Sequence, residues 1–160
     1  MTATLEPEAG SRAGRGLALV RLTLGAMFVW VFFENLGKGA YTPAGYAGVI
    51  NYYLTRGSAP DAWKAVMSLM AANAAIAGPV QAAAEISFGV LLTLGLATRL
   101  AALAASAFLA SLWVSELGAA WIWELLVPTL AAFAVAYGAA GRRWGLDGWL
   151  ARRYPRLPIW

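Results

Sequence analysis

Four glutamates lie inside or at the ends of long apolar stretches: Glu34, Glu85, Glu116 and Glu124. An ionisable side chain in a membrane segment is costly and normally faces the bundle interior, where it can relay protons or bind a cation. Glu85 is the deepest, about 9 Å from the nearer end of its stretch at ~1.5 Å per residue. We predict that Glu85 is a catalytic proton carrier; the alternative is a structural hydrogen bond or a salt bridge to Lys38. The other three are close enough to the ends to be solvated, Glu116 above all.

Aromatic and charged groups accompany these carboxylates at helical spacing. Trp30, Glu34 and Lys38 follow one another at intervals of four residues, so one helical face carries a ring, a carboxylate and an ammonium group. We predict that Lys38 is the counter-ion of the Glu34 carboxylate and is also a catalytic residue. Trp30 and Glu34 are predicted to bind a cofactor. The alternative for the tryptophan is an ordinary place in the aromatic belt at the membrane surface.

The last apolar stretch begins with a similar combination, because Trp121 and Glu124 are three residues apart. We predict that Glu124 is catalytic and that Trp121 stacks on a bound ring. Arg21 and Arg99 lie toward the opposite ends of their stretches. They are also predicted to bind a cofactor, and the alternative is that each extends its guanidinium to the membrane surface.

The sequence contains no cysteine and no histidine. These residues supply the thiolates of iron–sulfur clusters, the imidazole ligands of haem and the usual zinc ligands. We therefore expect no metal centre, haem or iron–sulfur cluster. Any redox chemistry would use a diffusible cofactor.

The elements that must position these residues are membrane helices. Of the 160 residues, 61% are hydrophobic and only 12% are charged, against about 25% charged in ordinary soluble domains. Four apolar stretches each approach the ~20 residues that a membrane helix needs. We predict an all-α, integral membrane protein, a bundle of four transmembrane helices within a membrane domain at 17–141. The predicted spans are about 17–36, 79–97, 100–118 and 121–140.

The positive charges predict the orientation of the bundle. Cytoplasmic loops carry an excess of lysine and arginine. One side of the predicted bundle holds only Lys38, Arg56 and Lys64. The other side is therefore predicted to be cytoplasmic, with both termini on it. It holds Arg12, Arg15, Arg99, Arg142, Arg143, Arg152, Arg153 and Arg156.

The segments between and beyond the spans have their own predicted roles. Residues 38–78 contain two stretches with apolar residues at helical spacing, which predicts two amphipathic helices on the external surface. We expect these two helices either to cap the bundle or to form a lid over a site. Residues 1–16 are predicted to be a flexible cytoplasmic tail. Residues 142–160 are predicted to be a basic tail with a short interfacial helix, for which Asp147 is the expected N-cap.

Several short motifs resemble those of one family when they are taken in order. An arginine early in the first span is followed by Glu-Asn-Leu-Gly-Lys at 34–38, then Glu85 with Gly89, and Gly-Leu-Ala-Thr-Arg at 95–99. Over about 17–153 the chain resembles the DoxX/DoxD family of four-helix membrane proteins. Trp-Ile-Trp-Glu at 121–124 is more similar to the DoxD branch, the membrane subunit of thiosulfate:quinone oxidoreductase.

The resemblance implies a bacterial or archaeal cytoplasmic-membrane subunit of an oxidoreductase that interacts with quinone, here at an outer-leaflet site. It also implies a second protein subunit, predicted on the external face. Two other functions stay open from the residues alone: a non-catalytic membrane anchor or assembly subunit, and a small proton-coupled cation carrier. The predicted partners are membrane lipids, that subunit and a second copy of the chain, but not nucleic acid.

Overall fold

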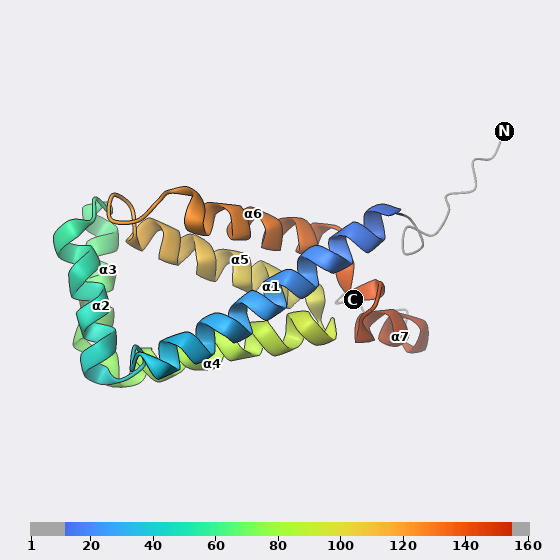
Figure 1. Cartoon of the computed structure of the whole chain (residues 1–160), viewed down its shortest axis with the longest axis horizontal. Helices are drawn as coiled ribbons and strands as arrows, with labels where there is room; N and C mark the ends of the chain where they lie inside the picture. The colour runs from blue at the N-terminus through green and yellow to red at the C-terminus, as the bar shows by residue number, and fades with distance from the viewer. Residues whose placement is uncertain (1–11, 155–160) are drawn as a thin grey trace.

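The computed structural model describes residues 12–154 (Figure 1). Within this range the chain is helical, with short turns and no strand. The parts of the predicted tails at 1–11 and 155–160 lie outside the described residues. The elements are α1 (Arg12–Gly37), α2 (Pro43–Arg56), α3 (Asp61–Ala72), α4 (Ala74–Leu94), α5 (Thr98–Ser115), α6 (Trp123–Tyr137), the short 3-10 helix η2 (Ala140–Arg142) and α7 (Leu146–Arg153).

Three helices within 12–154 are long and apolar enough to cross a membrane: α1 with 26 residues, α4 with 21 and α5 with 18. The fourth apolar helix, α6, has 15 residues. At ~1.5 Å per residue it is about 22 Å long, shorter than a hydrocarbon layer of about 30 Å. The chain is thus a multi-pass membrane protein. A fourth crossing at the predicted 121–140 stays a prediction, because α6 is shorter than that range.

The helices form two pairs, α1 with α4 and α5 with α6, and α1 crosses the bundle diagonally (Figure 1). Close approach of α1 and α4 depends on two glycines. A Cβ at Gly25 would collide with the backbone of Thr93, and one at Gly89 would collide with Val29. Small residues matter here because helices in lipid associate by close packing and not by burial of apolar surface from water. Between α5 and α6 the buried contact is made by small residues as well: Ala101, Ala102, Ala105, Ala132 and Ala136.

Three phenylalanine rings join the two pairs. Phe28 of α1 lies 5.4 Å from Phe88 of α4 and 6.3 Å from Phe108 of α5, measured between ring centroids. The rings of Phe88 and Phe108 are 5.7 Å apart. All three pairs are tilted, the arrangement that aromatic quadrupoles favour. This cluster lies between the two ends of the bundle and separates two groups of polar residues.

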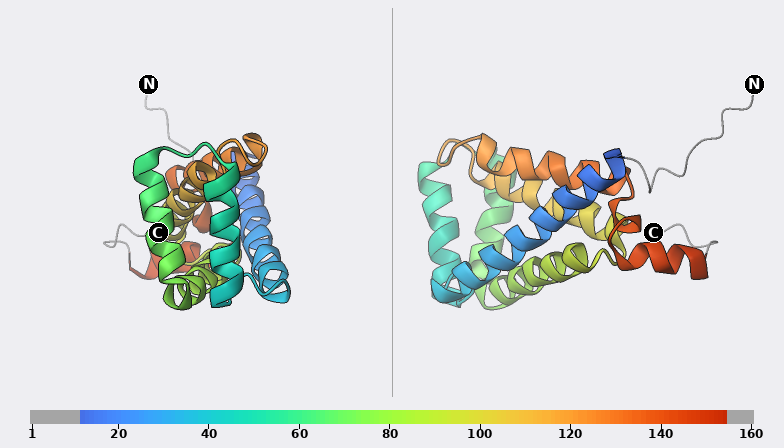
Figure 2. Two further views of the ribbon diagram at one scale, coloured as in Figure 1. Left: turned by 90° about the vertical axis from the view of Figure 1, so that its left-hand side faces the viewer. Right: turned by 45° about the vertical axis from the view of Figure 1, so that its right-hand side comes forward.

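One end of the bundle is closed by α2 and α3, which lie across it (Figure 2). We call it the α2–α3 end. The helices agree with the two amphipathic helices predicted within 38–78, and they enclose a small core of their own with Tyr46, Ile50 and Met67. Pro43 occupies the first turn of α2, and the Thr42 hydroxyl accepts a hydrogen bond from the Gly45 amide.

The opposite end carries the α4–α5 turn, the start of α1, η2 and α7, and we call it the α7 end. Two boundaries differ from the predicted ones. The first helix begins at Arg12, so residues 12–16 are helix and not tail. The second long helix begins at Ala74, before Pro79. A proline early in a helix removes one backbone hydrogen bond but does not prevent the helix from starting upstream.

Candidate functional site

Glu85 is a buried carboxylate with three hydrogen-bond donors. Its side chain is 1% exposed. Oε2 accepts from the Tyr41 hydroxyl at 2.5 Å and from the Asn35 amide at 3.3 Å, and Oε1 accepts from the Gln81 amide at 2.8 Å. We call these four residues the Glu85 cluster. They come from three parts of the chain: α1, the α1–α2 loop and α4.

Each donor is positioned by a different local feature. Gln81 lies one turn before Glu85 on α4, where residues four apart share a face. Tyr41 is held over α4 because Gly78 has no side chain; a Cβ there would collide with the Tyr41 backbone. The Tyr41 ring also stacks on Phe32, with centroids 5.7 Å apart and planes at 27°. The α1–α2 loop is therefore fixed on the bundle by the residue that donates to Glu85.

Only neutral side chains donate to this carboxylate, and within the described range 12–154 no cation forms an ion pair with it. Burial, followed by the hydrogen bond and the charge of Glu85, raises the pKa of the Tyr41 phenol. Tyr41 thus keeps its proton and acts as a donor. The cluster surrounds one buried carboxyl group with neutral hydrogen-bond donors.

Lys38 pairs with Glu34, as predicted. Nζ lies 2.6 Å from Glu34 Oε1, and the two side chains are 66% and 46% exposed. The pair belongs to the surface, near the start of the loop that carries Tyr41. Trp30, which shares the predicted stripe, is 73% exposed. The structure brings none of these three side chains into hydrogen-bond contact with Glu85.

A second acidic group lies where α2 meets the α5–α6 loop, and we call it the Glu116 group. Tyr53 donates to the half-buried Glu116 carboxylate at 3.0 Å. Trp63 of α3 donates to the Ser115 hydroxyl beside it at 2.9 Å. Burial raises the pKa of Glu116; the Tyr53 hydrogen bond opposes this, and the Glu124 charge adds to it.

Glu124 therefore belongs with Glu116 and not with Glu85. The side chain is exposed in the first turn of α6. Figure 1 shows the start of α6 and the start of α4 on opposite edges of the bundle at its α2–α3 end. Trp121 is 71% exposed beside a cavity of about 50 Å³, far below the roughly 300–1,000 Å³ of ordinary ligand sites. The lining residues are Trp113, Glu116, Leu117, Gly118, Ala120, Trp121 and Ile122.

Arg21 lies at the α7 end and is fully buried. Nη1 donates to the Leu92 carbonyl at 2.6 Å and to the Thr93 carbonyl at 3.2 Å, and Nη2 donates to the Trp144 carbonyl at 2.9 Å. Carbonyls in the last turn of a helix have no partner within the helix. Arg21 thus joins the end of α4 to the segment before α7, and Arg99 lies half-buried in the first turn of α5.

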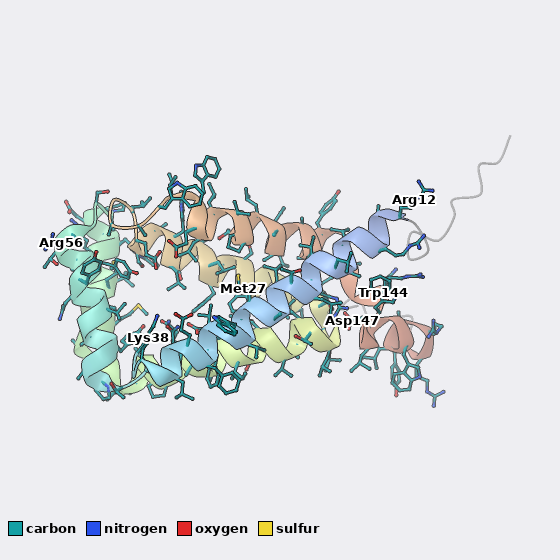
Figure 3. All side chains as sticks on the ribbon, viewed as in Figure 1. Arg12, Met27, Lys38, Arg56, Trp144 and Asp147 are labelled. Atoms are coloured by element: carbon teal, nitrogen blue, oxygen red, sulfur yellow. The ribbon has the colours of Figure 1, made fainter. Side chains whose placement is uncertain are left out.

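Asp147 does not cap its own helix, and this prediction was wrong. The N-cap of α7 is Gly145, and the side chain of Asp147 bonds to another helix. Its two carboxylate oxygens accept from the Ala97 and Thr98 amides at 2.7 and 2.8 Å, which are at the start of α5 (Figure 3). The tertiary contact prevails because a buried carboxylate at a helix N-terminus gains two charge-assisted bonds.

The sequence did not identify Asn35, Tyr41 or Tyr53 as site residues. Gln81 was recognisable from its spacing to Glu85, and Asn35 is a polar residue near the end of an apolar stretch. Tyr41 and Tyr53 carry no comparable signal, because tyrosine is common at membrane surfaces. Only the positions of the loop and of α2 show that their hydroxyls meet carboxylates.

One motif of the resemblance, residues 95–99, contacts the start of α7: the Ala97 and Thr98 amides donate to the Asp147 carboxylate, and the Gly95 carbonyl accepts from the Asp147 amide. Comparison with known proteins supports the same family. The DoxX family model matches residues 16–117, which is most of the chain and extends through α5. No curated protein and no solved structure matches significantly. The chain belongs to the DoxX family.

Proposed function

We propose that this protein is a membrane subunit of a quinone-linked oxidoreductase in which Glu85 carries protons. The observation that supports the proposal most is the Glu85 cluster, a buried carboxylate bonded only to neutral donors. Ionisable residues inside membrane bundles commonly mark proton relays. The family match supports a membrane protein of the DoxX family, and the redox role is our inference.

The absence of an ion-pair partner within 12–154 suits proton exchange at Glu85. Protonation of a paired carboxylate would leave a buried cation without its counter-charge, which is strongly unfavourable. Here the partners are two amides and a phenol. All three can rotate or reverse their hydrogen bonds when Glu85 takes up or releases a proton.

The residues of the cluster fit a quinone in part. A bound quinone accepts two electrons and two protons, and its carbonyl oxygens accept hydrogen bonds. Tyr41 and Gln81 can donate such bonds, and Glu85 can donate one when protonated. The stacked rings of Phe32 and Tyr41 supply an aromatic surface beside these groups. Trp30 lies on the exposed face of α1, where it would meet a ring that arrives from the lipid.

We propose that the electron donor is a separate redox subunit. We propose that this subunit docks at the α2–α3 end. Thiosulfate is one possible source of electrons, by analogy with the DoxD branch. The exposed Lys38 is paired with Glu34, so direct capture of an anion by Lys38 would require that pair to open.

The test compares Glu85→Gln with Asp61→Asn. Both changes remove one carboxylate from the α2–α3 end, but Glu85 is buried in the cluster, whereas Asp61 is exposed in the first turn of α3. Quinone reduction with thiosulfate as donor would be followed in native membranes that contain the partner subunits, together with the amount of quinone that purifies with the protein. We expect Glu85→Gln to lower the rate at least tenfold and Asp61→Asn to leave it nearly unchanged. Full activity in Glu85→Gln would exclude the proton-carrying role.

A proton-coupled cation carrier is the second candidate, and the same cluster favours it. Glu85 has no ion-pair partner within residues 12–154, and a buried carboxylate without a resident cation is able to bind a mobile one. Uptake of a lipophilic cation into proteoliposomes would be measured across a pH gradient. Uptake that is lost in Glu85→Gln would support the carrier, because a redox subunit alone should move no cation.

A non-catalytic anchor is the remaining candidate. Exposed apolar side chains on α3 and the start of α4, such as Leu69 and Ile76, supply the contact surface for a partner. Purification with native lipids, followed by mass spectrometry of bound chains and quinone, distinguishes the candidates. A partner chain without quinone favours the anchor, and quinone that depends on Glu85 favours the redox subunit.

A further inference from the structure

We propose that α7 and the arginines around it form a binding site for anionic phospholipid headgroups. The site lies at the α7 end, opposite the Glu85 cluster. It is independent of the quinone proposal. The argument rests on charge, on the apolar side chains between the charges, and on the way α7 is attached to the bundle.

The two ends of the bundle carry opposite charge. At the α2–α3 end, five acidic residues (Glu34, Asp61, Glu85, Glu116 and Glu124) outnumber three basic ones (Lys38, Arg56 and Lys64). At the α7 end, residues 12–154 include one acidic residue, Asp147, and eight arginines. These are Arg12, Arg15, Arg21, Arg99, Arg142, Arg143, Arg152 and Arg153.

Within residues 12–154, the one carboxylate of the α7 end is Asp147, and its hydrogen bonds go to backbone amides and not to Arg152 or Arg153. Asp147 is 1% exposed and directs both oxygens to the amides at the start of α5. Arg152 and Arg153 are exposed in the last turn of α7. The α7 end therefore presents positive charge on its surface. A partner that binds there must carry negative charge.

Apolar side chains lie among these charges. Leu146 is 44% exposed, Trp149 60% and Trp144 54%. The guanidinium of Arg143 lies 5.8 Å from the Trp144 ring centroid, a cation–π contact. Tryptophan next to arginine is typical of a helix at the level of lipid headgroups, where rings enter the acyl boundary and cations meet phosphates.

The attachment of α7 places these groups beyond the bundle. Figure 2 shows α7 past the ends of α4 and α5, and Figure 3 shows Asp147 and Trp144 at that junction. The Asp147 amide donates to the Gly95 carbonyl at 2.8 Å, and Arg21 holds the Trp144 carbonyl. If α4 and α5 cross the hydrocarbon, α7 follows at the level of the headgroups. Lipid at that level supplies phosphates for the arginines and an acyl boundary for the tryptophans.

The test uses the full chain purified in detergent and titrated with phosphatidylglycerol or phosphatidylcholine under native mass spectrometry. The double variant Arg152→Gln/Arg153→Gln is compared with Arg56→Gln/Lys64→Gln, which removes the same charge from the α2–α3 end. At roughly fivefold in affinity for each arginine near an anionic surface, we expect phosphatidylglycerol to bind about 10- to 30-fold more weakly to the first variant. The second variant should bind it like the unmodified protein.

Three results would overturn the proposal. The two lipids could bind equally well, or both double variants could lose affinity to the same extent. Inorganic phosphate at millimolar concentration could also displace the lipid completely, which would indicate a free-anion site. All four substituted side chains are on the surface or at helix ends, and an unchanged melting temperature would confirm that each variant is folded.

Discussion

The buried charged side chains at the two ends of the bundle use their hydrogen bonds differently. At the α7 end, Arg21 and Asp147 bond to backbone atoms at the end of α4, at the start of α5 and just before α7. At the α2–α3 end, Glu85 bonds only to side chains. Helix ends have unpaired backbone groups that must be satisfied wherever water is absent. Charges that satisfy them are therefore structural.

The Glu85 cluster meets no such requirement. Glu85 lies inside α4, where the backbone groups already pair with one another, and its donors are side chains that could have been apolar. Burial of a carboxylate without structural need is unfavourable in lipid. The contrast supports our proposal that the Glu85 cluster serves function, whereas the buried charges of the α7 end stabilise the fold. The predictions below test this division.

Loss of the Arg21 guanidinium should have the largest effect on stability. Arg21→Met keeps much of the side-chain volume but removes the guanidinium bonds to the Leu92 and Trp144 carbonyls, which leaves Leu92 with only the long bond from the Gly95 amide at 3.3 Å. We expect a loss of about 3 kcal/mol in the free energy of unfolding, because buried groups lose charge-assisted bonds. Thermal unfolding in detergent measures it. Arg56→Met, at an exposed position on α2, should change stability by less than ~0.5 kcal/mol.

Removal of the α5 cap should have a smaller effect that stays local. Asp147→Ala leaves the Ala97 and Thr98 amides unpaired and should cost about 2 kcal/mol, as for a strong N-cap. Hydrogen exchange at the start of α5 should accelerate. Exchange in the middle of α4 should stay slow. Unchanged protection at Ala97 and Thr98 would contradict the assigned cap.

Glu116 should make stability depend on pH. Its folded-state pKa is raised above the usual 4.5, first by burial. The folded state therefore holds the proton at pH values where the unfolded state has lost it, so this contribution is present below about pH 4.5 and is lost as pH rises through the folded pKa. Melting temperatures measured across that range should fall less in Glu116→Gln than in the unmodified protein. A fall of equal size in both would contradict the raised pKa.

Glu85→Gln should have the smallest effect on stability. The glutamine oxygen can accept from Tyr41 and Asn35, while its amide donates to the oxygen of a rotated Gln81 side chain. We expect a change below ~1 kcal/mol, whereas Glu85→Leu should cost about 2 kcal/mol because it leaves three buried donors unpaired. Differential scanning calorimetry would compare them. If Glu85→Gln destabilised the protein as strongly as Arg21→Met, Glu85 would be structural as well.

The sequence predicted the helices better than their contacts. The apolar stretches identified α1, α4 and α5 to within a few residues, and the spacing within 38–78 identified α2 and α3. The ion pair of Glu34 with Lys38 followed from positions four apart on one helix. The burial of Glu85 was predicted from its depth within an apolar stretch alone. These inferences succeed because helical periodicity and the cost of charge in lipid are properties of local sequence.

The role of Asp147 and the partner of Glu116 depended on distant contacts, and the predicted N-cap at Asp147 differs from the structure. No local rule states that Asp147 meets the start of α5, 49 residues away along the chain, or that α2 places Tyr53 beside Glu116. Composition and periodicity thus determined by themselves that this chain enters a membrane as apolar helices with carboxylates inside. The tertiary structure decided which partner each charge has, because hydrogen bonds between helices depend on how those helices cross.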